Sequence, residues 1–489
     1  MLNLLAFDLG GSSGKLLQGN FNGRDISLSL IEKFENRSVQ INGALYWDII
    51  TVYQALLDGI KKAAASSNLH SLGIDSFSND FALIDKNGEL LSPVRCYRDD
   101  RTIRFADYIY NRVSPRRLYE LTGNQNARFN TLMQIGAMQG TGQGWLLDHA
   151  DRLLFVPNLL LFLLTGTIGA EYTIASVSQL FSFYDEDFSR ELLDIFSLNK
   201  ELFGPVLKSG SNAGTITKRL CAENSILPFS VVSVCEHDTA SAYCASPFQG
   251  KNHIIISSGT WALMGCELDK PLINEEGYRY NFANEGGYPG HHRFLRNVMG
   301  SWIIQQIRSF NLEHGKNYSY AEMEKEAETS TPFAYFIDVD DDLFFSPGNM
   351  PGKIHDYCMA HYSSAPANTG ALVRCVYESL AMKYRRNLEL LRHITNKSFS
   401  FINIIGGGAR DKLMCQFTAD ACNLPVAAGP EEATALGNII VQLIAAGEIT
   451  NLEEGRKIIA DSFPVLRYEP NDNAVWEEQY RKYCELIPI

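Results

Sequence analysis

An acidic residue near the middle of the chain, Asp238, stands where an acid can do chemistry. A β-branched run at residues 231–234 ends in Glu236, His237, Asp238 and Thr239, and small residues follow. This order predicts a strand, a polar tip and a helix. The last side chains of a buried strand are held rigidly yet face a crevice, so an acid there can act on a substrate. Asp and Thr also accept backbone N–H bonds at helix starts, so a capping role stays open.

A turn of small residues near the amino terminus is a second candidate. An apolar run at 4–8 breaks at Gly10, glycines and serines continue to Gly14, Lys15 follows, and an Asn-Gly turn comes at 22–23. The spacing predicts strand, tight loop, strand. It is one residue short of a Walker A motif and no helix pattern follows, so we reject a P-loop. A hairpin that lines a phosphate site remains, with a plain turn as the alternative.

The amino-terminal pattern recurs in the second half of the chain, which also carries a triple-glycine turn. Residues 250–266 again predict strand, small-residue turn and strand, which suggests a duplicated architecture. Residues 399–405 predict a strand that ends in the glycine turn 406–409 ahead of a helix. A nucleotide could lie there against backbone and helix terminus, or the glycines could serve tight packing. We expect a helix at 433–446 to pack beside the same site.

A polar loop separates two further predicted strands near residue 80. There Asp75 and Asp80 bracket Phe77, Ser78 and Asn79. Acids and an amide around an aromatic ring suit a polyol, whose hydroxyls need paired donors and acceptors while its CH face packs on a ring. A solvated loop is the alternative.

Length and composition limit the classes of protein. A chain of 489 residues with 45% apolar residues predicts two large domains. A net charge of −13 argues against a general binder of nucleic acid or anionic membranes. The apolar run at 153–164 is shorter than the roughly 20 residues of a spanning helix, and no signal peptide is indicated. The ten cysteines form no CxxC pair, so we expect reduced thiols, no zinc site and a cytoplasmic location.

Taken together, these stretches resemble the FGGY family of carbohydrate kinases, most closely its members that act on L-rhamnulose. The matching stretches run from residue 6 to residue 438 in the family's order: FDLGGSSGK, YRDDRT, FNTL, EHDTASA, SSGTWALMG, NEGG, NVMGSW, GGGARDKL and GPEEATALGN. The resemblance implies an α/β fold of two ribonuclease-H-like domains, of the actin, hexokinase and Hsp70 type, around a central cleft. Residues 1–247 would bind mainly the sugar and residues 248–489 mainly ATP, with a last helix able to pack back on the first domain.

The resemblance also assigns roles to residues. Asp238 would be the base for the primary hydroxyl of an open-chain ketose as the γ-phosphoryl group of ATP arrives. Because an ordinary Asp has a pKa of about 3.9, its role would be mainly to orient the hydroxyl. Asp8 and Asp238 would help to hold Mg²⁺, through water. The residues that would contact the sugar are Ser78, Asp80, His237, Thr239 and Asn297. Those that would contact ATP are Gly11, Ser12, Ser13, Gly14, Lys15, Thr260, Gln305 and Gly407.

The expected reaction is therefore the ATP-dependent, Mg²⁺-requiring conversion of L-rhamnulose to L-rhamnulose 1-phosphate. The partners would be a small-molecule ketose and ATP, with no nucleic acid and no membrane, and the protein would be a monomer or homodimer. A non-catalytic sugar or nucleotide sensor is the alternative from another class. Retention of Asp8, Lys15, Asp238 and Thr260 argues against it.

The chain departs from the family pattern where substrate choice would be read. Members that act on L-rhamnulose typically carry Thr-Trp-Gly-Val after Ile-Asp, whereas this chain has Ser76, Phe77, Ser78 and Asn79. A new hydroxyl and a new amide beside the sugar can change which hydroxyl stereochemistry is accepted, because an unpaired buried polar group costs about 1 to 3 kcal/mol. L-fuculose, or another ketose or polyol, stays an alternative substrate.

Overall fold

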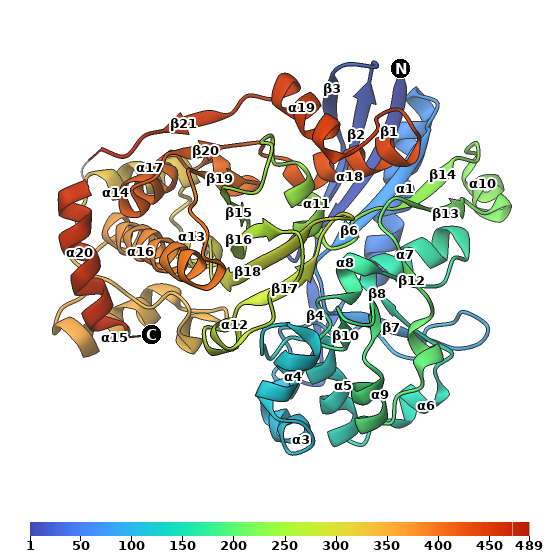
Figure 1. Cartoon of the computed structure of the whole chain (residues 1–489), viewed down its shortest axis with the longest axis horizontal. Coiled ribbons are helices and arrows are strands. Elements are labelled where there is room, and N and C mark those ends of the chain that lie inside the picture. Colours follow the sequence, from blue (N-terminus) through green and yellow to red (C-terminus); the bar gives the residue numbers. More distant parts are fainter. Residues whose placement is uncertain (472, 489) are drawn as a thin grey trace. The chain divides into compact units, whose positions relative to one another are not determined.

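The computed structural model describes residues 1–471 and 473–488. The chain divides into two compact α/β units, whose elements are labelled in Figure 1. Unit 1 comprises Met1–Gln249, Glu267–Phe294 and Ala433–Phe463. Unit 2 comprises Gly250–Cys266, Leu295–Glu432 and Pro464–Ile489.

The unit boundaries add detail to the expected division at 247/248. Two later segments return to unit 1, and the second carries α18 (Ala433–Ala445) and α19 (Leu452–Ser462). The last helix, α20 (Asn473–Leu486), is part of unit 2. The division of sugar and ATP binding between the two domains stays a prediction.

Unit 1 is built on a six-stranded sheet with a fully buried central strand. Its strands, in spatial order, are β13 (Ser211–Thr215), β14 (Ser230–Ser233), β6 (Ser71–Ser76), β1 (Leu2–Leu9), β2 (Ser13–Phe21) and β3 (Ile26–Glu35). Strand β1 pairs antiparallel with β2 and parallel with β6. Residues Leu4 to Phe7 are completely buried, a continuous apolar run that is typical of a strand covered on both faces. Asp8 follows this run, so a carboxylate stands near the carboxyl end of the strand.

Helices cover both faces of this sheet. Leu5, Phe7 and Leu9 of β1 share one apolar core with α1 (Ile49–Ser66) and α7 (Val156–Thr165). The opposite face of β1 contacts α18, which also packs on α11 (Asp238–Cys244). Because side chains alternate along a strand, the face that holds Asp8 is the one that α18 covers.

The smaller elements of unit 1 surround this framework. They are β4 (Ser38–Ile41), β5 (Ala44–Trp47), β7 (Phe81–Ile84), α2 (Arg101–Arg104), α3 (Ala106–Tyr110), α4 (Pro115–Thr122), α5 (Thr131–Gly140), α6 (Trp145–His149), β8 (Arg152–Phe155), β9 (Ala170–Glu171), α8 (Tyr172–Ala175), β10 (Phe181–Ser182), β11 (Asp187–Phe188), α9 (Arg190–Ile195), the 3₁₀ helix Lys200–Phe203, β12 (Val206–Leu207), α10 (Lys218–Asn224), α12 (Glu275–Arg279) and β17 (Ala283–Gly286).

Unit 2 repeats the strand pattern of unit 1. Five strands of a seven-stranded sheet run in the order β16 (Ala262–Leu268), β15 (Ile254–Ser258), β19 (Ile402–Ile405), β20 (Val426–Ala428) and β21 (Leu466–Tyr468). Strand β15 is antiparallel to β16 and parallel to β19, as β1 is to β2 and β6. The expected duplication of the hairpin is therefore confirmed.

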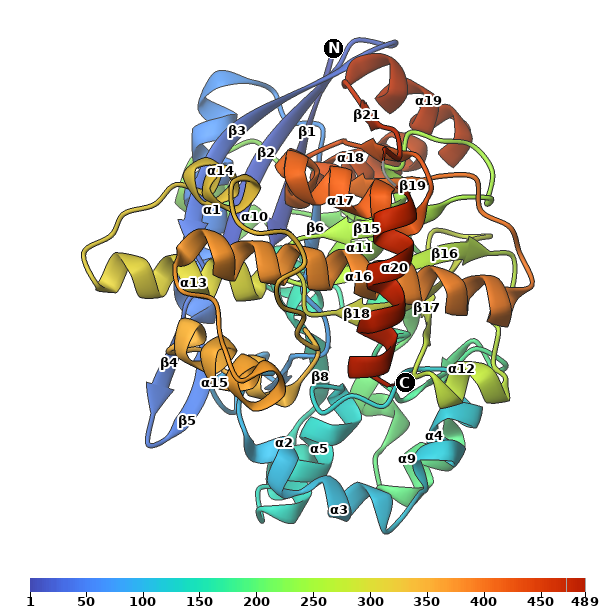
Figure 2. The ribbon, with the colours of Figure 1, turned by 90° about the vertical axis from the view of Figure 1, so that its left-hand side faces the viewer.

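The helices of unit 2 include one of 27 residues, α16 (Thr369–Thr395). They are α13 (Trp302–Glu313), α14 (Tyr320–Glu328), α15 (Met350–Tyr362), α16 (Thr369–Thr395), α17 (Lys412–Cys422) and α20, with 3₁₀ turns at Asp342–Phe344 and Gly407–Arg410; β18 (His292–Val298) ends in this unit. Figure 2 shows α16, which contacts both α14 and α17. Of the helices in the described part of the chain, none is long and apolar enough to cross a membrane.

One sequence expectation is corrected by these elements, and another gains detail. Helix α11 begins at Asp238 with His237 at its N-cap, so Thr239 lies inside the helix and does not cap it. The residues just ahead of α18 lie beside the glycine turn, since the Gly406 N–H donates to the Pro430 carbonyl at 3.0 Å, and the helix itself packs on α11 in unit 1. The two helices approach closely: a Cβ on Gly437 would lie 1.7 Å from the Ser241 carbonyl oxygen of α11, so only glycine permits this contact.

Candidate functional site

The polar tip after β14 is held by side chains from residues far away in the sequence. A carboxylate oxygen of Glu171 accepts the backbone N–H of Glu236 at 3.1 Å. The hydroxyl of Thr173 accepts the backbone N–H of His237 at 3.2 Å and itself donates to Glu171. Glu171 is fully buried. The tip therefore has a fixed backbone before any substrate arrives.

Glu236 supports the tip and is not a candidate base. Its two carboxyl oxygens accept the Ser233 hydroxyl and the Asn158 amide. Burial and the nearby charge of Glu171 raise the pKa of Glu236 well above its ordinary value. Glu236 therefore holds a proton more readily than an ordinary Glu, and both of its oxygens are engaged in supporting the tip.

Asp238 is the ionisable residue of the tip that remains available for chemistry. Its side chain is 27% exposed. Its Oδ1 accepts the backbone N–H of Thr239 at 2.5 Å and the Thr239 hydroxyl at 3.1 Å. Burial raises the pKa of Asp238 to about 6, although both hydrogen bonds with Thr239 oppose the shift. The carboxylate is therefore ionised at neutral pH, yet it is a stronger base than an ordinary Asp.

A row of charged side chains crosses three strands of unit 1. The strand register sets Asp8 of β1 between Lys15 of β2 and Asp75 of β6. Burial and the charges of Asp8 and Asp238 raise the pKa of Asp75 well above its ordinary value, while the Asn438 amide donates to its Oδ2 at 2.6 Å. The sequence predicts Asp75 only as part of a polyol-binding loop. Its position beside Asp8 follows from the pairing of β1 with β6.

The carboxylates of Asp8, Asp75 and Asp238 suit a divalent cation that is held mainly through water. Mutual repulsion among Asp8, Asp75 and Asp238 would be relieved by a cation. In the described ranges, however, no three His, Cys, Asp or Glu side chains converge as a ready ligand set. Mg²⁺ suits such a site because it keeps several waters and binds phosphate oxygens with one or two carboxylates.

The hairpin between β1 and β2 is tighter than the sequence suggests. Strand β2 begins at Ser13, so Ser13, Gly14 and Lys15 lie in the strand, and only residues 10–12 form the turn. The Gly10 N–H donates to the Ser13 carbonyl at 2.9 Å. A Cβ on Gly14 would lie 2.2 Å from the ring of Phe34, so packing explains the glycine there. The phosphate contacts of Gly11, Ser12, Ser13, Gly14 and Lys15 stay predictions.

An aromatic cluster surrounds the loop between β6 and β7. The ring of Trp47 lies 4.7 Å from that of Phe77 and 6.1 Å from that of Tyr97, measured between centroids. Asp80 fixes this cluster, since it accepts the Trp47 indole N–H at 2.5 Å, the Tyr97 backbone N–H at 3.0 Å and the Gln134 amide at 2.7 Å. Burial raises the pKa of Asp80 to about 7. Trp47 and Tyr97 escape sequence reasoning because they lie on other segments, and direct contact of Asp80 with sugar stays a prediction.

The residues that depart from the family pattern lie in the same loop. Asn79 has a φ of 74°, a left-handed conformation that Asn tolerates better than most residues. Its amide donates to Ser78 Oγ at 2.9 Å, and its carbonyl accepts the Thr131 hydroxyl at 2.9 Å. The loop is therefore rigid, and Ser78 is half-buried within it.

In unit 2 the structure brings two predicted ATP residues onto one small framework. The turn between β15 and β16 carries Thr260, whose carbonyl accepts the Trp302 N–H at 3.1 Å. The hydroxyl of Ser301 donates to the Gly259 carbonyl at 2.6 Å and accepts the Gln305 amide at 3.0 Å. Thr260 and the start of α13 are thus tied together.

The glycine turn after β19 packs on the end of β15. Gly406 has a φ of 81°, and a Cβ on Gly408 would lie 2.0 Å from Ser258 Oγ. Gly407, the predicted adenosine contact, is exposed between them. Asn297, a predicted sugar contact, lies in β18, and its buried Oδ1 has no hydrogen-bond donor among the described residues.

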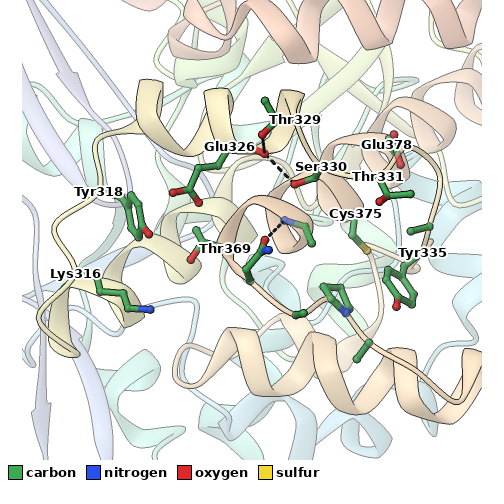
Figure 3. Close-up of a pocket in the computed structure, with 16 residues that line it drawn as sticks. Lys316, Tyr318, Glu326, Thr329, Ser330, Thr331, Tyr335, Thr369, Cys375 and Glu378 are labelled. Carbon is green, nitrogen blue, oxygen red and sulfur yellow. Dashed lines mark hydrogen bonds between the residues drawn. The ribbon is translucent and has the colours of Figure 1, made fainter.

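A separate polar pocket of about 830 Å³ lies in unit 2 (Figure 3). Its lining comes from the segment around α14 and from the start of α16, with Lys316, Tyr318 and Glu326 along one side. No predicted site residue lines it. The pocket is therefore not part of the predicted ATP site.

Comparison with known proteins identifies the family. Residues 3–245 match the N-terminal domain, and residues 254–446 the C-terminal domain, of the FGGY family of carbohydrate kinases. The rhamnulokinase of Bacteroides thetaiotaomicron is 38% identical over 486 residues, which cover 99% of each chain. The rhamnulokinase of Bacillus subtilis is 34% identical, with 96% of this chain and 95% of the relative covered.

Solved structures with low sequence identity share the fold. The ligand-bound xylulose kinase from Lactobacillus acidophilus aligns with a TM-score of 0.81 at 16% identity, over 99% of this chain and 97% of that chain. Plasmodium falciparum glycerol kinase with ADP aligns with a TM-score of 0.78 at 15% identity, and the alignment covers 100% of this chain and 99% of that chain. The predicted two-domain α/β kinase fold is confirmed. With matching domain models over most of its length and close relatives over nearly all of it, the chain belongs to the FGGY family of carbohydrate kinases.

Proposed function

We propose that the protein is an ATP-dependent kinase that phosphorylates the primary hydroxyl of L-rhamnulose to give L-rhamnulose 1-phosphate. The observation that carries the proposal is the rigidly held Asp238, which is buried enough to be a stronger base yet is ionised at neutral pH. The sugar is inferred from relatives named rhamnulokinase at 38% and 34% identity.

In the proposed reaction, Asp238 accepts a hydrogen bond from the primary hydroxyl of the sugar. This bond directs the hydroxyl oxygen of the sugar at the incoming phosphoryl group. The proton passes to the carboxylate late, because phosphoryl transfer proceeds through a loose transition state. Positioning therefore contributes more than proton removal, which agrees with the rigid tip. His237, Thr239 and Asn297 would hold the remaining sugar hydroxyls.

ATP supplies the phosphoryl group, and Mg²⁺ neutralises the charge on its phosphates. Asp8 and Asp75, with Asp238, would hold the hydrated cation, and Lys15 stands beside Asp8 in the strand register. The turns that carry Thr260 and Gly407, together with Gln305, would bind the nucleotide.

Ser78 would set part of the sugar specificity. Because Ser78 Oγ accepts the Asn79 amide, its own O–H is oriented to donate, and a sugar oxygen is a suitable acceptor. This hydroxyl keeps L-fuculose, or another ketose or polyol, as the second candidate substrate. We also propose that the protein is cytoplasmic and that it is a monomer or homodimer. Light scattering after size-exclusion chromatography measures the oligomeric state.

The direct test is an ADP-coupled assay with Mg²⁺ and ATP over L-rhamnulose, L-fuculose, L-ribulose, D-xylulose and glycerol. We expect the highest kcat/KM with L-rhamnulose and a sugar 1-phosphate product. A higher kcat/KM for another ketose would move the assignment to that sugar. Measurable ATP binding without ADP formation on any member would instead favour a sensor.

A further inference from the structure

We propose that the buried Arg293, which pairs with Glu285, is a positioning residue that keeps the imidazole of His237 in the tautomer with its proton on Nε2. Neither residue belongs to the predicted site. The consequence for catalysis rests on the proposed function, whereas the tautomer itself is a property of the free protein.

Arg293 is locked in place from two sides. Its side chain is completely buried, and its Nε donates to the Gly286 carbonyl at 2.9 Å. One terminal nitrogen lies 3.0 Å from a carboxylate oxygen of Glu285, and the other lies 3.1 Å from Nδ1 of His237. Strands β17 and β18 supply Glu285 and Arg293, so the pair is carried on regular structure.

The chemistry of the guanidinium decides the tautomer. Arg has only donors, so Nδ1 of His237 must accept. A neutral imidazole carries one proton, which is then on Nε2. Because Nδ1 accepts from Arg293, it carries no proton of its own, so the contact itself requires a neutral ring.

The opposite tautomer is possible in principle and is less well matched. In that tautomer an Nδ1–H would face a carboxylate oxygen of Glu285 that lies 3.5 Å away. The same Nδ1–H would also face an N–H of Arg293, and two donors repel each other. On the other side of the ring, Nε2 lies 3.5 Å from Asp238 Oδ1. A proton on Nε2 faces that carboxylate and is attracted to it, whereas a bare Nε2 lone pair would repel it.

Arg293 thus acts on the base through His237. The Nε2–H is aimed at the region where Asp238 and the reacting hydroxyl meet, so it can orient either oxygen. Arg293 touches neither and is a positioning residue.

The primary test is ¹⁵N–¹H correlation NMR of the full chain labelled with ¹⁵N-histidine, without substrate. The His237 signals are assigned by their loss in His237→Gln. We expect a protonated Nε2 and an unprotonated Nδ1. A proton on Nδ1, or a doubly protonated ring at neutral pH, would overturn the proposal. This readout needs no activity, so it stands even if the sugar kinase assignment fails.

Variants of the pair give the second test. Arg293→Met removes the donor and leaves Glu285 as the partner of Nδ1, so the proton should move to Nδ1. Glu285→Gln and Arg293→Lys each leave a cationic donor at residue 293 and should keep the wild-type tautomer. Arg456→Met is the matched control, because Arg456 is an equally buried Arg of unit 1 that pairs with Glu267 at 2.9 Å. It should lower stability without moving the His237 proton, and an unchanged tautomer in Arg293→Met would contradict the proposal.

Kinetics separate positioning from general destabilisation. A Gln at residue 237 can place an amide N–H near the position of Nε2, whereas an Asn places it near Nδ1. With the sugar that the wild type phosphorylates, His237→Gln should retain at least about tenfold more kcat than His237→Asn at similar melting temperatures. Equal kcat values would refute a donor role for Nε2. A wild type inactive on all sugars, with the expected tautomer, would refute the proposed function alone.

Discussion

Asp238 combines a raised pKa with a fixed orientation. Burial raises its pKa to about 6, and two bonds from Thr239 fix its orientation. Only the ionised carboxylate can act as the proposed base, and the ionised fraction falls as the pH drops through that pKa.

The pH dependence of turnover follows from this pKa. Because protonation of Asp238 removes the acceptor for the sugar hydroxyl, kcat should be level above about pH 7 and fall about tenfold per unit well below pH 6. Steady-state kinetics with saturating sugar and ATP, with the coupling enzymes checked at each pH, measure it. A kcat that stays level down to pH 4.5 would contradict the role of this carboxylate.

Ser78 gives a specificity prediction at the same scale. Ser78→Gly removes the hydroxyl that Asn79 orients, so the ratio of kcat/KM for L-rhamnulose to that for L-fuculose should change by about 5- to 100-fold, as expected for one hydrogen bond. Ser66→Gly, on the last turn of α1 and away from this loop, is a control that should leave the ratio unchanged. An unaltered ratio in Ser78→Gly would show that this hydroxyl does not contact the sugar.

Residues with local patterns could be predicted, and residues with only spatial roles could not. Asp8 and Asp238 each follow an apolar run, so the end of a strand is visible in the sequence. Glu171 and Arg293 have no such signal, because their partners in the tip lie 65 and 56 residues away in the sequence. Buried charged residues of this kind are recognisable only once their partners are known.

At the scale of elements, the contact between α11 and α18 holds the helix that begins with Asp238, the proposed base. Helix α11 starts with Asp238, and α18 crosses it at Gly437. The sequence predicts both helices, since each carries a helical pattern. It does not predict their contact, because glycines in an apolar helix give no indication of which neighbour they face.

Gly437→Ala tests this contact. A Cβ there would lie 1.7 Å from the Ser241 carbonyl oxygen, so α11 and α18 must separate, and the free energy of unfolding should fall by about 1 to 3 kcal/mol. We expect kcat to fall as well, because Asp238 moves with α11. Gly144→Ala is the matched control, since a Cβ there meets nothing closer than 3.6 Å. Urea denaturation that gives equal stabilities for both variants would contradict the packing.

At the scale of the whole molecule, two units repeat one arrangement of strands around a hairpin. The sequence shows the duplication because both hairpins carry the same small-residue turn between apolar strands. It does not show that residues 433–463 return to unit 1, because that exchange depends on packing between distant segments such as Asn438 and Asp75. The resemblance to the family supplied the fold as a whole, and the matching domain models confirm it.

The central claim is that this fold positions Asp238 to orient the ketose hydroxyl that receives the phosphoryl group of ATP. The measurement that tests it most directly compares wild type and Asp238→Asn for ADP formation with L-rhamnulose and for ATP binding by calorimetry. We predict that the variant binds ATP as the wild type does and loses about 10²- to 10⁴-fold in kcat. An Asp238→Asn protein that turns over L-rhamnulose at the wild-type rate would contradict the account.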